Sequence, residues 1–147
     1  MKIDKYDHPD DLLYYIADPG HIWIRRLENS VQIGADDFSQ DLAGDISFVR
    51  VKKEGKKVTK GGTVGTFETA KWVGPMKSPV DGTILARNPE VAEKPEIINE
   101  RPYDAWIAEI AVENLDEQLA DPLIVPVGDK LREYILSQIT KYRDTLE

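Results

Sequence analysis

The sequence predicts a mainly β protein, an antiparallel sandwich or barrel with short helices and one longer helix near its C-terminus. Three observations lead to this expectation. From residue 46 onwards, short β-type runs alternate with glycine-containing turns, a spacing typical of antiparallel sheets and not of βαβ units. Near the C-terminus, apolar residues recur at helical spacing. The length of 147 residues, 41% of them hydrophobic, fits one domain with a modest core.

The first half of the chain contains two strand candidates and one short helix. Asp18-Pro19-Gly20 predicts a turn, because these residue types favour turn conformations. Strands are predicted at His21–Leu27 and Ser30–Gly34, joined as a hairpin. A short helix is predicted over residues 36–44, because acidic residues stand at its positive N-terminal end and Gly44 can end it.

The second half is predicted to hold the remaining strands. Its β-type runs are Ile46–Val51, Val58, Thr63–Phe67, Val80 and Thr83–Ala86. Because Asn88–Pro102 contains three prolines, we expect a long structured loop there. Tyr103–Val112 is expected to be the last strand, with Trp106 available to the core, and Asn114–Pro126 a linker with one helical turn.

The C-terminal helix has the clearest secondary-structure pattern. Its apolar residues recur at intervals of three and four: Leu131, Ile135, Ile139, Tyr142 and Leu146. Asp129 is the expected N-terminal cap, because an aspartate oxygen can accept from a free backbone N–H of the first turn. We expect this apolar stripe to cover an open end of the sheet.

Composition and charge exclude several classes of function. Nineteen basic and twenty-seven acidic residues give a net charge of −8, the wrong sign for general nucleic-acid binding. No apolar run is long enough for a membrane helix, and the polar, acidic N-terminus resembles neither a signal nor a transit peptide, so a cytoplasmic protein is expected. There is no cysteine, and His8 and His21 lack ligand-spaced partners, so no metal site is expected. Because no motif for nucleophilic catalysis is present, the protein is not expected to be an enzyme.

One segment has the opposite charge to the rest of the chain. Residues 50–62 contain one acidic and six basic residues, the latter being Arg50, Lys52, Lys53, Lys56, Lys57 and Lys60. This basic island is either the solvated face of a hairpin or a docking patch for an acidic partner.

Lys71 lies at the middle of a nearly symmetric hairpin. Gly61 precedes it by ten residues and Gly82 follows it by eleven, and both glycines mark turns. The two arms are expected to run antiparallel and to hold Lys71 away from the body of the protein, within reach of a modifying enzyme. An ordinary exposed loop lysine would have the same geometry.

The residues around this lysine resemble the lipoyl hairpin of glycine cleavage system H proteins. The resemblance rests on Glu68-Thr69-Ala70-Lys71 and on Ser78-Pro79-Val80-Asp81-Gly82. His21-Ile22-Trp23 is similar to that family's His-x-Trp opening, and Pro95-Glu96-Ile97-Ile98-Asn99-Glu100 to its late loop. Together the similar segments cover about residues 20–112.

This resemblance implies a fold, a cofactor and a site. The fold is a flattened barrel-sandwich hybrid of two antiparallel sheets, with an N-terminal extension at 1–19, a carrier domain at 20–112, and a linker and helix at 113–147. Lipoic acid would be joined to Lys71 by an amide bond. The implied surroundings of the cofactor are Glu68, Thr69, Ala70, Trp72, Ile22 and Trp23. Biotin carriers share this hairpin but resemble one another in having methionines beside the lysine, where this chain has Ala70 and Trp72.

Two departures from the family pattern bear on what the arm carries. Ile22 stands where glycine cleavage H proteins typically have a glutamate, and an isoleucine cannot pair with an amine. The run Trp72-Val73-Gly74-Pro75 resembles the H-protein-like lipoate-binding proteins of heterodisulfide-reductase-like sulfur oxidation. The sequence therefore favours a sulfur or electron carrier. A glycine cleavage carrier, a lipoyl-relay scaffold and an unmodified binding module are the alternatives.

The implied partners follow from these interpretations. A lipoate ligase or a lipoyl transferase would attach the cofactor. A heterodisulfide-reductase-like complex would use the arm, or the P, T and L proteins of glycine cleavage in the alternative. No nucleic acid or membrane partner is expected, and the protein is expected to be a monomer.

Overall fold

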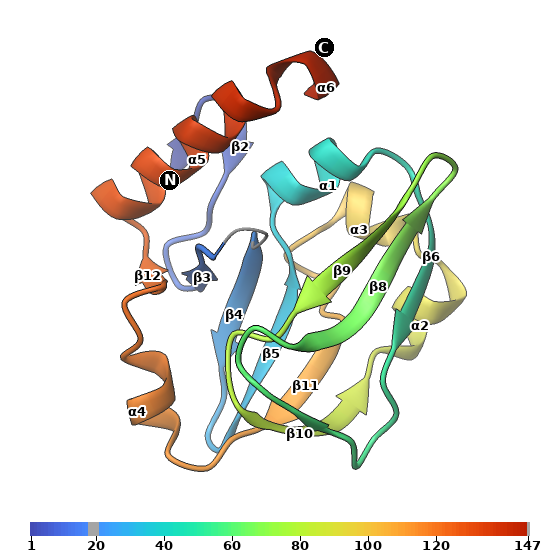
Figure 1. Ribbon diagram of the computed structural model, residues 1–147, viewed down its shortest axis with the longest axis vertical. Helices are drawn as coiled ribbons and strands as arrows, with labels where there is room; N and C mark the ends of the chain where they lie inside the picture. The colour runs from blue at the N-terminus through green and yellow to red at the C-terminus, as the bar shows by residue number, and fades with distance from the viewer. Residues whose placement is uncertain (18–20, 147) are drawn as a thin grey trace.

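A computed structural model describes residues 1–17 and 21–146. Figure 1 shows two main antiparallel sheets, with short helices at the margins and a longer helix across one end. This architecture confirms the predicted fold class. The turn predicted at Asp18-Pro19-Gly20 lies outside the described residues. Within the described part of the chain, no helix has both the length and the apolar character needed to cross a membrane.

The larger sheet has seven strands and, in the view of Figure 1, lies behind the smaller one. In spatial order they are β12 (Ile124–Pro126), β3 (Leu13–Tyr15), β4 (Ile22–Arg26), β5 (Ser30–Ala35), β11 (Ala108–Ala111), β10 (Gly82–Arg87) and β7 (Lys57–Val58). The predicted hairpin of β4 and β5 is present, with Ile22 opposite Ala35 and Trp23 opposite Gly34. The two outermost strands at one edge, β12 and β3, come from the two ends of the chain.

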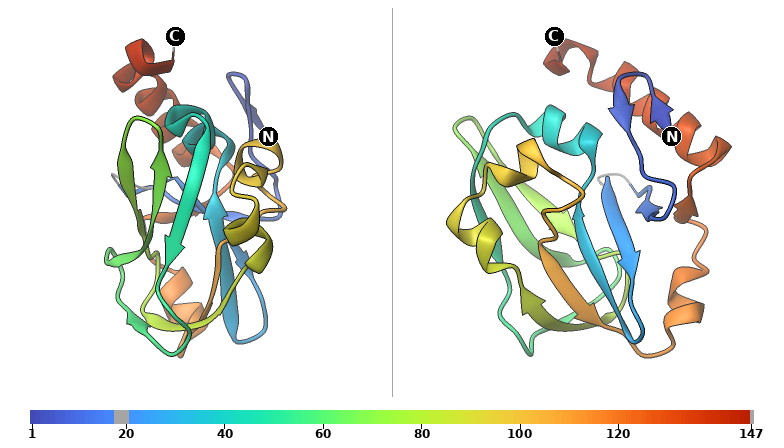
Figure 2. Two further views of the ribbon diagram at one scale, coloured as in Figure 1. Left: turned by 90° about the vertical axis from the view of Figure 1, so that its right-hand side faces the viewer. Right: turned by 180° about the vertical axis from the view of Figure 1, so that it is seen from behind.

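The smaller sheet has three strands and carries the predicted lysine hairpin. Its order is β6 (Ile46–Val51), β8 (Thr63–Thr69) and β9 (Val73–Lys77). Seen from the side in Figure 2, it forms a second layer over part of the larger sheet. Apolar side chains from both sheets fill the space between them, among them Ile24, Ile33, Val64, Phe67 and Ile110. This cluster is the main core.

A second core lies beneath elements from both ends of the chain. We call these elements the terminal layer: β1 (Lys2–Ile3), β2 (Tyr6–Asp7), α5 (Asp129–Lys141) and α6 (Arg143–Leu146). Figures 1 and 2 show α5 and the β1–β2 hairpin together at one end of the molecule. The buried members of this second core are Ile3, Tyr6, Leu12, Tyr14, Trp23, Phe38, Val125, Leu131 and Ile135. The apolar stripe of α5 therefore packs on a core of its own.

Helix caps agree with the sequence in one case and differ in another. α1 (Asp37–Ala43) begins as predicted, because the Asp36 carboxylate accepts from the Ser39 N–H at 2.7 Å. It ends at Gly44, whose φ of 77° suits glycine. The predicted helix α5 is present, but its predicted cap was wrong: Gly128 is the N-cap, and Asp129 is the first helical residue. An aspartate at this position still interacts favourably with the positive end of the helix dipole.

Three further segments differ from the prediction. Residues 88–102 contain two helices, α2 (Pro89–Glu93) and α3 (Ile97–Glu100), the first begun by the Asn88 side chain and Pro89. The last strand is shorter than expected, because the chain turns at residues 102–104 and only β11 pairs. The predicted linker contains the helical turn α4 (Leu115–Leu119) and also the unpredicted strand β12.

Two single residues also depart from their predicted places. Val80 is buried but belongs to no strand, because the Ser78 hydroxyl bonds to its backbone and shapes a bend there. Trp106 is half-buried at the margin of the second core.

Candidate functional site

The turn that carries Lys71 joins β8 to β9 through only three residues. Its backbone is closed by the Thr69 N–H, which donates to the Trp72 carbonyl at 2.9 Å. The Thr69 hydroxyl accepts from the N–H groups of Lys71 and Trp72, at 3.2 and 3.3 Å. Ala70 and Lys71 are exposed at the tip. Among the residues that the structure describes, no carboxylate forms an ion pair with Lys71.

Trp72 folds back from the turn and lies over Gly74. A Cβ atom added to Gly74 would approach the indole ring to 1.8 Å, so only glycine fits beneath the ring in this position. The indole remains 41% exposed. It therefore provides an accessible aromatic surface next to Lys71.

An apolar groove of about 310 Å³ opens beside this indole. Its lining comes from both sheets, α1 and the C-terminal end of the chain: His21, Ile22, Ala35, Ser39, Leu42, Ala43, Ile46, Phe67, Trp72, Gly74, Pro75, Tyr142 and Thr145. Ile22 and Trp72, fifty positions apart in the sequence, line the same groove. The lining contains no aspartate, glutamate, lysine or arginine. Such a groove suits an uncharged chain, because burying an unpaired charge there would be costly.

A second depression, of about 410 Å³, lies on the side of the turn that faces α1. It shares Leu42, Ala43, Trp72 and Thr145 with the apolar groove, but it also has two carboxylates in its lining, Asp41 and Asp45. Lys71 is part of its wall. The two hollows next to the turn thus differ in charge.

Glu68 lies on the outer face of the smaller sheet. Phe67, its neighbour in β8, points inward and is buried, and the strand alternation therefore turns Glu68 outward. The Arg50 Nε donates to its carboxylate at 3.3 Å. Glu68 is thus close to Lys71 in the hairpin but does not line the groove.

The structure does not place Trp23 with the other predicted site residues. Trp23 is fully buried in the second core, its ring packs against Gly34, and its Nε1 donates to the Pro102 carbonyl at 2.9 Å. Adjacent residues of a strand point to opposite faces, so Ile22 faces the groove while Trp23 faces away. The same alternation rule, applied to the sequence, separates the two residues.

Sequence reasoning missed several groove residues because they come from distant segments. Leu42 and Phe67 were expected only as parts of the short helix at 36–44 and of the strand Thr63–Phe67, and the contribution of Tyr142 and Thr145 depends on where the C-terminal end lies. No local signal in the sequence reports that placement.

Both histidines lie close to a buried aspartate, which their sequence spacing did not suggest. The Asp36 Oδ2 is 3.6 Å from His8 Nε2 and 3.9 Å from His21 Nδ1, and all three side chains are buried. His21 Nε2 contacts Gln138 Oε1 of α5 at 3.0 Å. Burial and the charge of Asp36 raise the pKa of the nearby Tyr14 hydroxyl. In the described part of the chain, no group of three or more acidic or histidine side chains could hold a metal ion.

Comparisons with known proteins agree with this geometry. The family model for the glycine cleavage H-protein matches residues 13–125. A probable glycine cleavage system H protein 3 of Saccharolobus solfataricus is 44% identical over 117 residues, which are 79% of this chain and 82% of the relative. The glycine cleavage system H protein 2 of Aquifex aeolicus is 38% identical over 130 residues, 86% of this chain and 80% of the relative.

A solved structure shares the fold. The crystal structure of a glycine cleavage system H protein from Mycobacterium marinum superposes with a TM-score of 0.69, covering 89% of this chain and 98% of its own, at 24% sequence identity.

Proposed function

This chain belongs to the glycine cleavage H-protein family, whose members are non-catalytic carriers, and we propose that its arm is a lipoyl group on Lys71. The observation that carries the proposal is the three-residue turn, which holds Lys71 exposed next to an apolar groove. A lipoyl-attaching enzyme, either a ligase or a transferase, would load the lysine.

The residues present around Lys71 fit a lipoyl group. When bound, the group supplies a dithiol that can be oxidised, reduced or loaded. The Thr69 hydroxyl fixes the turn by accepting from the N–H groups of Lys71 and Trp72, and Lys71 is exposed to solvent at the tip. Ile22, Phe67 and Trp72 offer an apolar wall against which an uncharged chain can pack. Because the protein contains no cysteine, no thiol of its own can exchange with the arm.

For the cargo, we put the aminomethyl group of glycine decarboxylation first. The names of the relatives support this assignment, since they are called glycine cleavage system H proteins. The partners would then be the P, T and L proteins of that system. In the sequence, Ile22 and Trp72 favoured a sulfur or electron carrier over a glycine cleavage carrier. The ranking of these two candidates is now reversed.

A sulfur or electron carrier is the second candidate, and one observation favours it. The groove beside Trp72 has no carboxylate to pair with the amine of an aminomethylated arm, whereas a neutral dithiol would be well accommodated there. In that case a heterodisulfide-reductase-like complex would be the partner.

A direct activity comparison separates the two candidates. The lipoylated protein is supplied to the P and T enzymes with glycine, and in parallel to a heterodisulfide-reductase-like complex. Glycine decarboxylation at the rate of an authentic H protein supports the first candidate. Turnover only by the heterodisulfide-reductase-like complex supports the second.

A matched pair of variants tests whether the apolar groove sets the cargo. Ile22→Glu adds a carboxylate to the groove, and Ile22→Gln adds a side chain of similar shape without the charge. If the groove holds the loaded arm, glycine decarboxylation should rise in Ile22→Glu relative to Ile22→Gln, with thermal melting as a check on folding. Equal rates would show that the groove does not select the cargo.

An unmodified binding module is the remaining alternative, and intact mass distinguishes it from both carriers. Protein incubated with lipoate, ATP and a lipoate–protein ligase should gain one lipoyl mass. Folded protein that gains none would overturn the proposal.

A further inference from the structure

The outer face of the smaller sheet exposes large apolar side chains close to Lys71. Phe48 of β6 is 50% exposed and Val73 of β9 is 62% exposed. The strand register places Phe48 opposite Glu68, and Glu68 opposite Val73, in one row across the sheet. Since neighbouring strands lie about 4.8 Å apart, this row spans about 10 Å. Val73 is only two residues from Lys71, so the row lies immediately behind the turn.

Arg50 completes this surface and gives it a positive side. Its guanidinium carbon lies 4.9 Å from the centre of the Phe48 ring, and its Nε bonds to Glu68. The planar group is thereby held in place over an aromatic ring. We call Phe48, Arg50, Glu68 and Val73 the outer patch.

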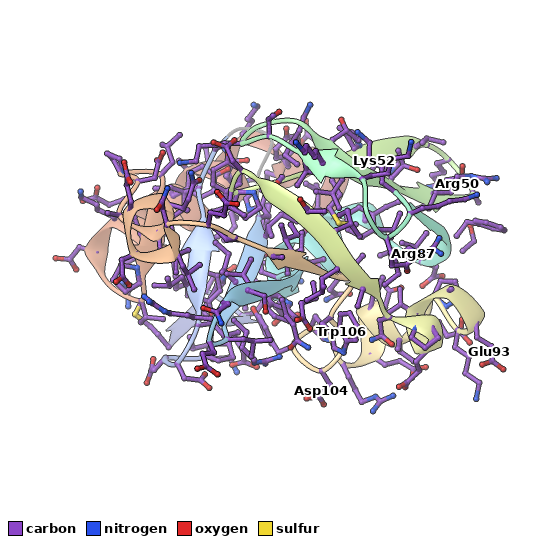
Figure 3. The ribbon with its side chains drawn as sticks, turned by 90° about the horizontal axis from the view of Figure 1, so that it is seen from below. Arg50, Lys52, Arg87, Glu93, Asp104 and Trp106 are labelled. Carbon is purple, nitrogen blue, oxygen red and sulfur yellow. The ribbon has the colours of Figure 1, made fainter. Side chains whose placement is uncertain are left out.

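The positive charge continues away from Lys71 along the chain. Lys52 and Lys53 follow Arg50 and are exposed. Figure 3 shows Arg50 and Lys52 on the same side of the molecule. Lys60, another member of the basic island, is instead paired with Asp121. Because the protein as a whole has a net charge of −8, this positive side stands out against an acidic body.

We propose that the outer patch is the docking face for the enzyme that attaches the lipoyl group to Lys71. This inference rests on the proposed function. The enzyme must act on the lysine amine itself, before any arm exists, so its active site has to come within the reach of one four-carbon side chain. The rim of that active site must therefore contact the residues next to the turn, which include the row of Phe48, Glu68 and Val73. Enzymes that act later meet a longer arm and can dock farther away.

The chemistry of the patch indicates the chemistry of the partner's surface. Exposed aromatic and arginine side chains contribute most of the binding energy in many interfaces, and they do so by filling well-packed pockets on the partner. The Phe48 ring and the stacked Arg50 would therefore fit an apolar pocket on the partner's surface. Arg50 near the end of β6, and Lys52 and Lys53 directly after that strand, would pair with carboxylates on the partner's surface at that side. Attraction between the two would accelerate association most at low ionic strength.

Lipoylation kinetics of exposed-residue variants test this proposal. The assay uses lipoate, ATP and lipoate–protein ligase, and follows the gain of lipoyl mass. Phe48→Ser and Arg50→Glu should each lower kcat/KM by about tenfold, mainly through KM, because each removes one anchor of an interface. Added salt should slow lipoylation of the wild type and have less effect on Arg50→Glu.

Two control variants change the same chemistry elsewhere. Leu85→Ser removes a 53% exposed side chain from β10 of the other sheet. Lys130→Glu reverses an exposed charge in the first turn of α5. In Figure 1 this end of the helix is the one farther from the β8–β9 hairpin. Both should be lipoylated at the wild-type rate, and all four variants should melt close to the wild-type temperature.

The outcomes separate this inference from the proposed function. If the wild type is lipoylated on Lys71 and the patch variants react equally fast, the docking face is wrong and the carrier assignment stands. If the wild type is not lipoylated, the carrier assignment itself fails. Should Phe48→Ser instead convert a dimer to a monomer in sedimentation experiments, with lipoylation unchanged, the patch binds a second copy of this chain.

Discussion

The Lys71 turn and the terminal layer are stabilised in opposite ways. The turn is exposed and is held by hydrogen bonds among Thr69, Lys71 and Trp72, all within four residues. The terminal layer joins segments more than a hundred residues apart, and it is held by buried apolar side chains from α5 and the β1–β2 hairpin. The exposure of Lys71 and the stability of the terminal layer thus depend on different sets of contacts.

This difference predicts how substitutions will behave. Changes at the turn should alter modification and leave the free energy of unfolding nearly unchanged, because little apolar surface is buried there. Changes under the terminal layer should lower stability and leave modification of the folded protein intact.

Lys71→Arg should abolish lipoylation completely while the fold is retained. Arginine keeps the positive charge but has no primary amine to form the amide, and Lys71 is exposed at the tip of the turn. Intact mass after incubation with lipoate, ATP and ligase measures the effect, and circular dichroism checks the fold. A lipoyl mass found on another residue, such as Lys77, would refute the assignment.

Trp23→Ala should have the opposite effect and destabilise the protein by about 3–5 kcal/mol. The substitution removes a fully buried indole and leaves Gly34 without its packing partner. Urea unfolding measures the loss. At temperatures where the variant is folded, its lipoylation rate should match the wild type.

Trp23→Phe serves as the milder companion variant. It keeps an aromatic ring in the second core but loses the hydrogen bond to the Pro102 carbonyl. Its stability should lie between those of the wild type and the alanine variant. A large fall in lipoylation of folded Trp23→Phe would show that Trp23 does belong to the cofactor site.

The Lys71 turn could be predicted from the sequence because its determinants are local. The glycines at the ends of the hairpin and the short β-type runs all lie within one segment. The same is true of α1, where Asp36 caps and Gly44 ends the helix. Such signals depend on backbone conformation a few residues away, and not on tertiary contacts.

The terminal layer and the groove could not be predicted in this way. β12 has three residues and exists because Ile124 and its neighbours pair with β3, far away in sequence. The groove combines Ile22, Trp72 and Tyr142 from three distant segments. Their meeting is a property of the assembled fold. Trp23 was misplaced for a simpler reason, since a family motif was read as one site although adjacent strand residues face opposite ways.

Glu68→Ala should slow lipoylation several-fold, by about 1 kcal/mol in apparent binding, with little change in stability. The carboxylate lies next to the turn and orients Arg50, so its loss disturbs the surface that the attaching enzyme meets. Glu113→Ala, an exposed glutamate distant in sequence, is the matched control. Equal lipoylation kinetics in the two variants would leave Glu68 with no role in recognition.

The weakest effect is expected for the ion pair between Lys60, which precedes β8, and Asp121, which precedes β12. Lys60 Nζ donates to Asp121 Oδ2 at 2.6 Å, and the Leu123 N–H donates to Oδ1 at 2.8 Å. The hydrogen bond from Lys60, followed by that from Leu123, lowers the pKa of the Asp121 carboxyl. A carboxyl with a lowered pKa stabilises the fold above its unfolded value, near pH 4, and this contribution is lost as the pH falls through the folded value.

Asp121→Asn should therefore lower the free energy of unfolding by about 0.5–1 kcal/mol at pH 7, in the range of partly exposed ion pairs. The difference from the wild type should shrink as the pH falls from about 4 through the lower pKa of the folded state, because the wild-type carboxyl loses its charge over this range. Urea unfolding at a series of pH values measures it, with Lys60→Met expected to weaken the same pH dependence. Lipoylation should be unchanged in both variants, since neither residue contacts the Lys71 turn. A stability difference that persists undiminished at pH 2 would mean that Asp121 acts by shape and not by charge.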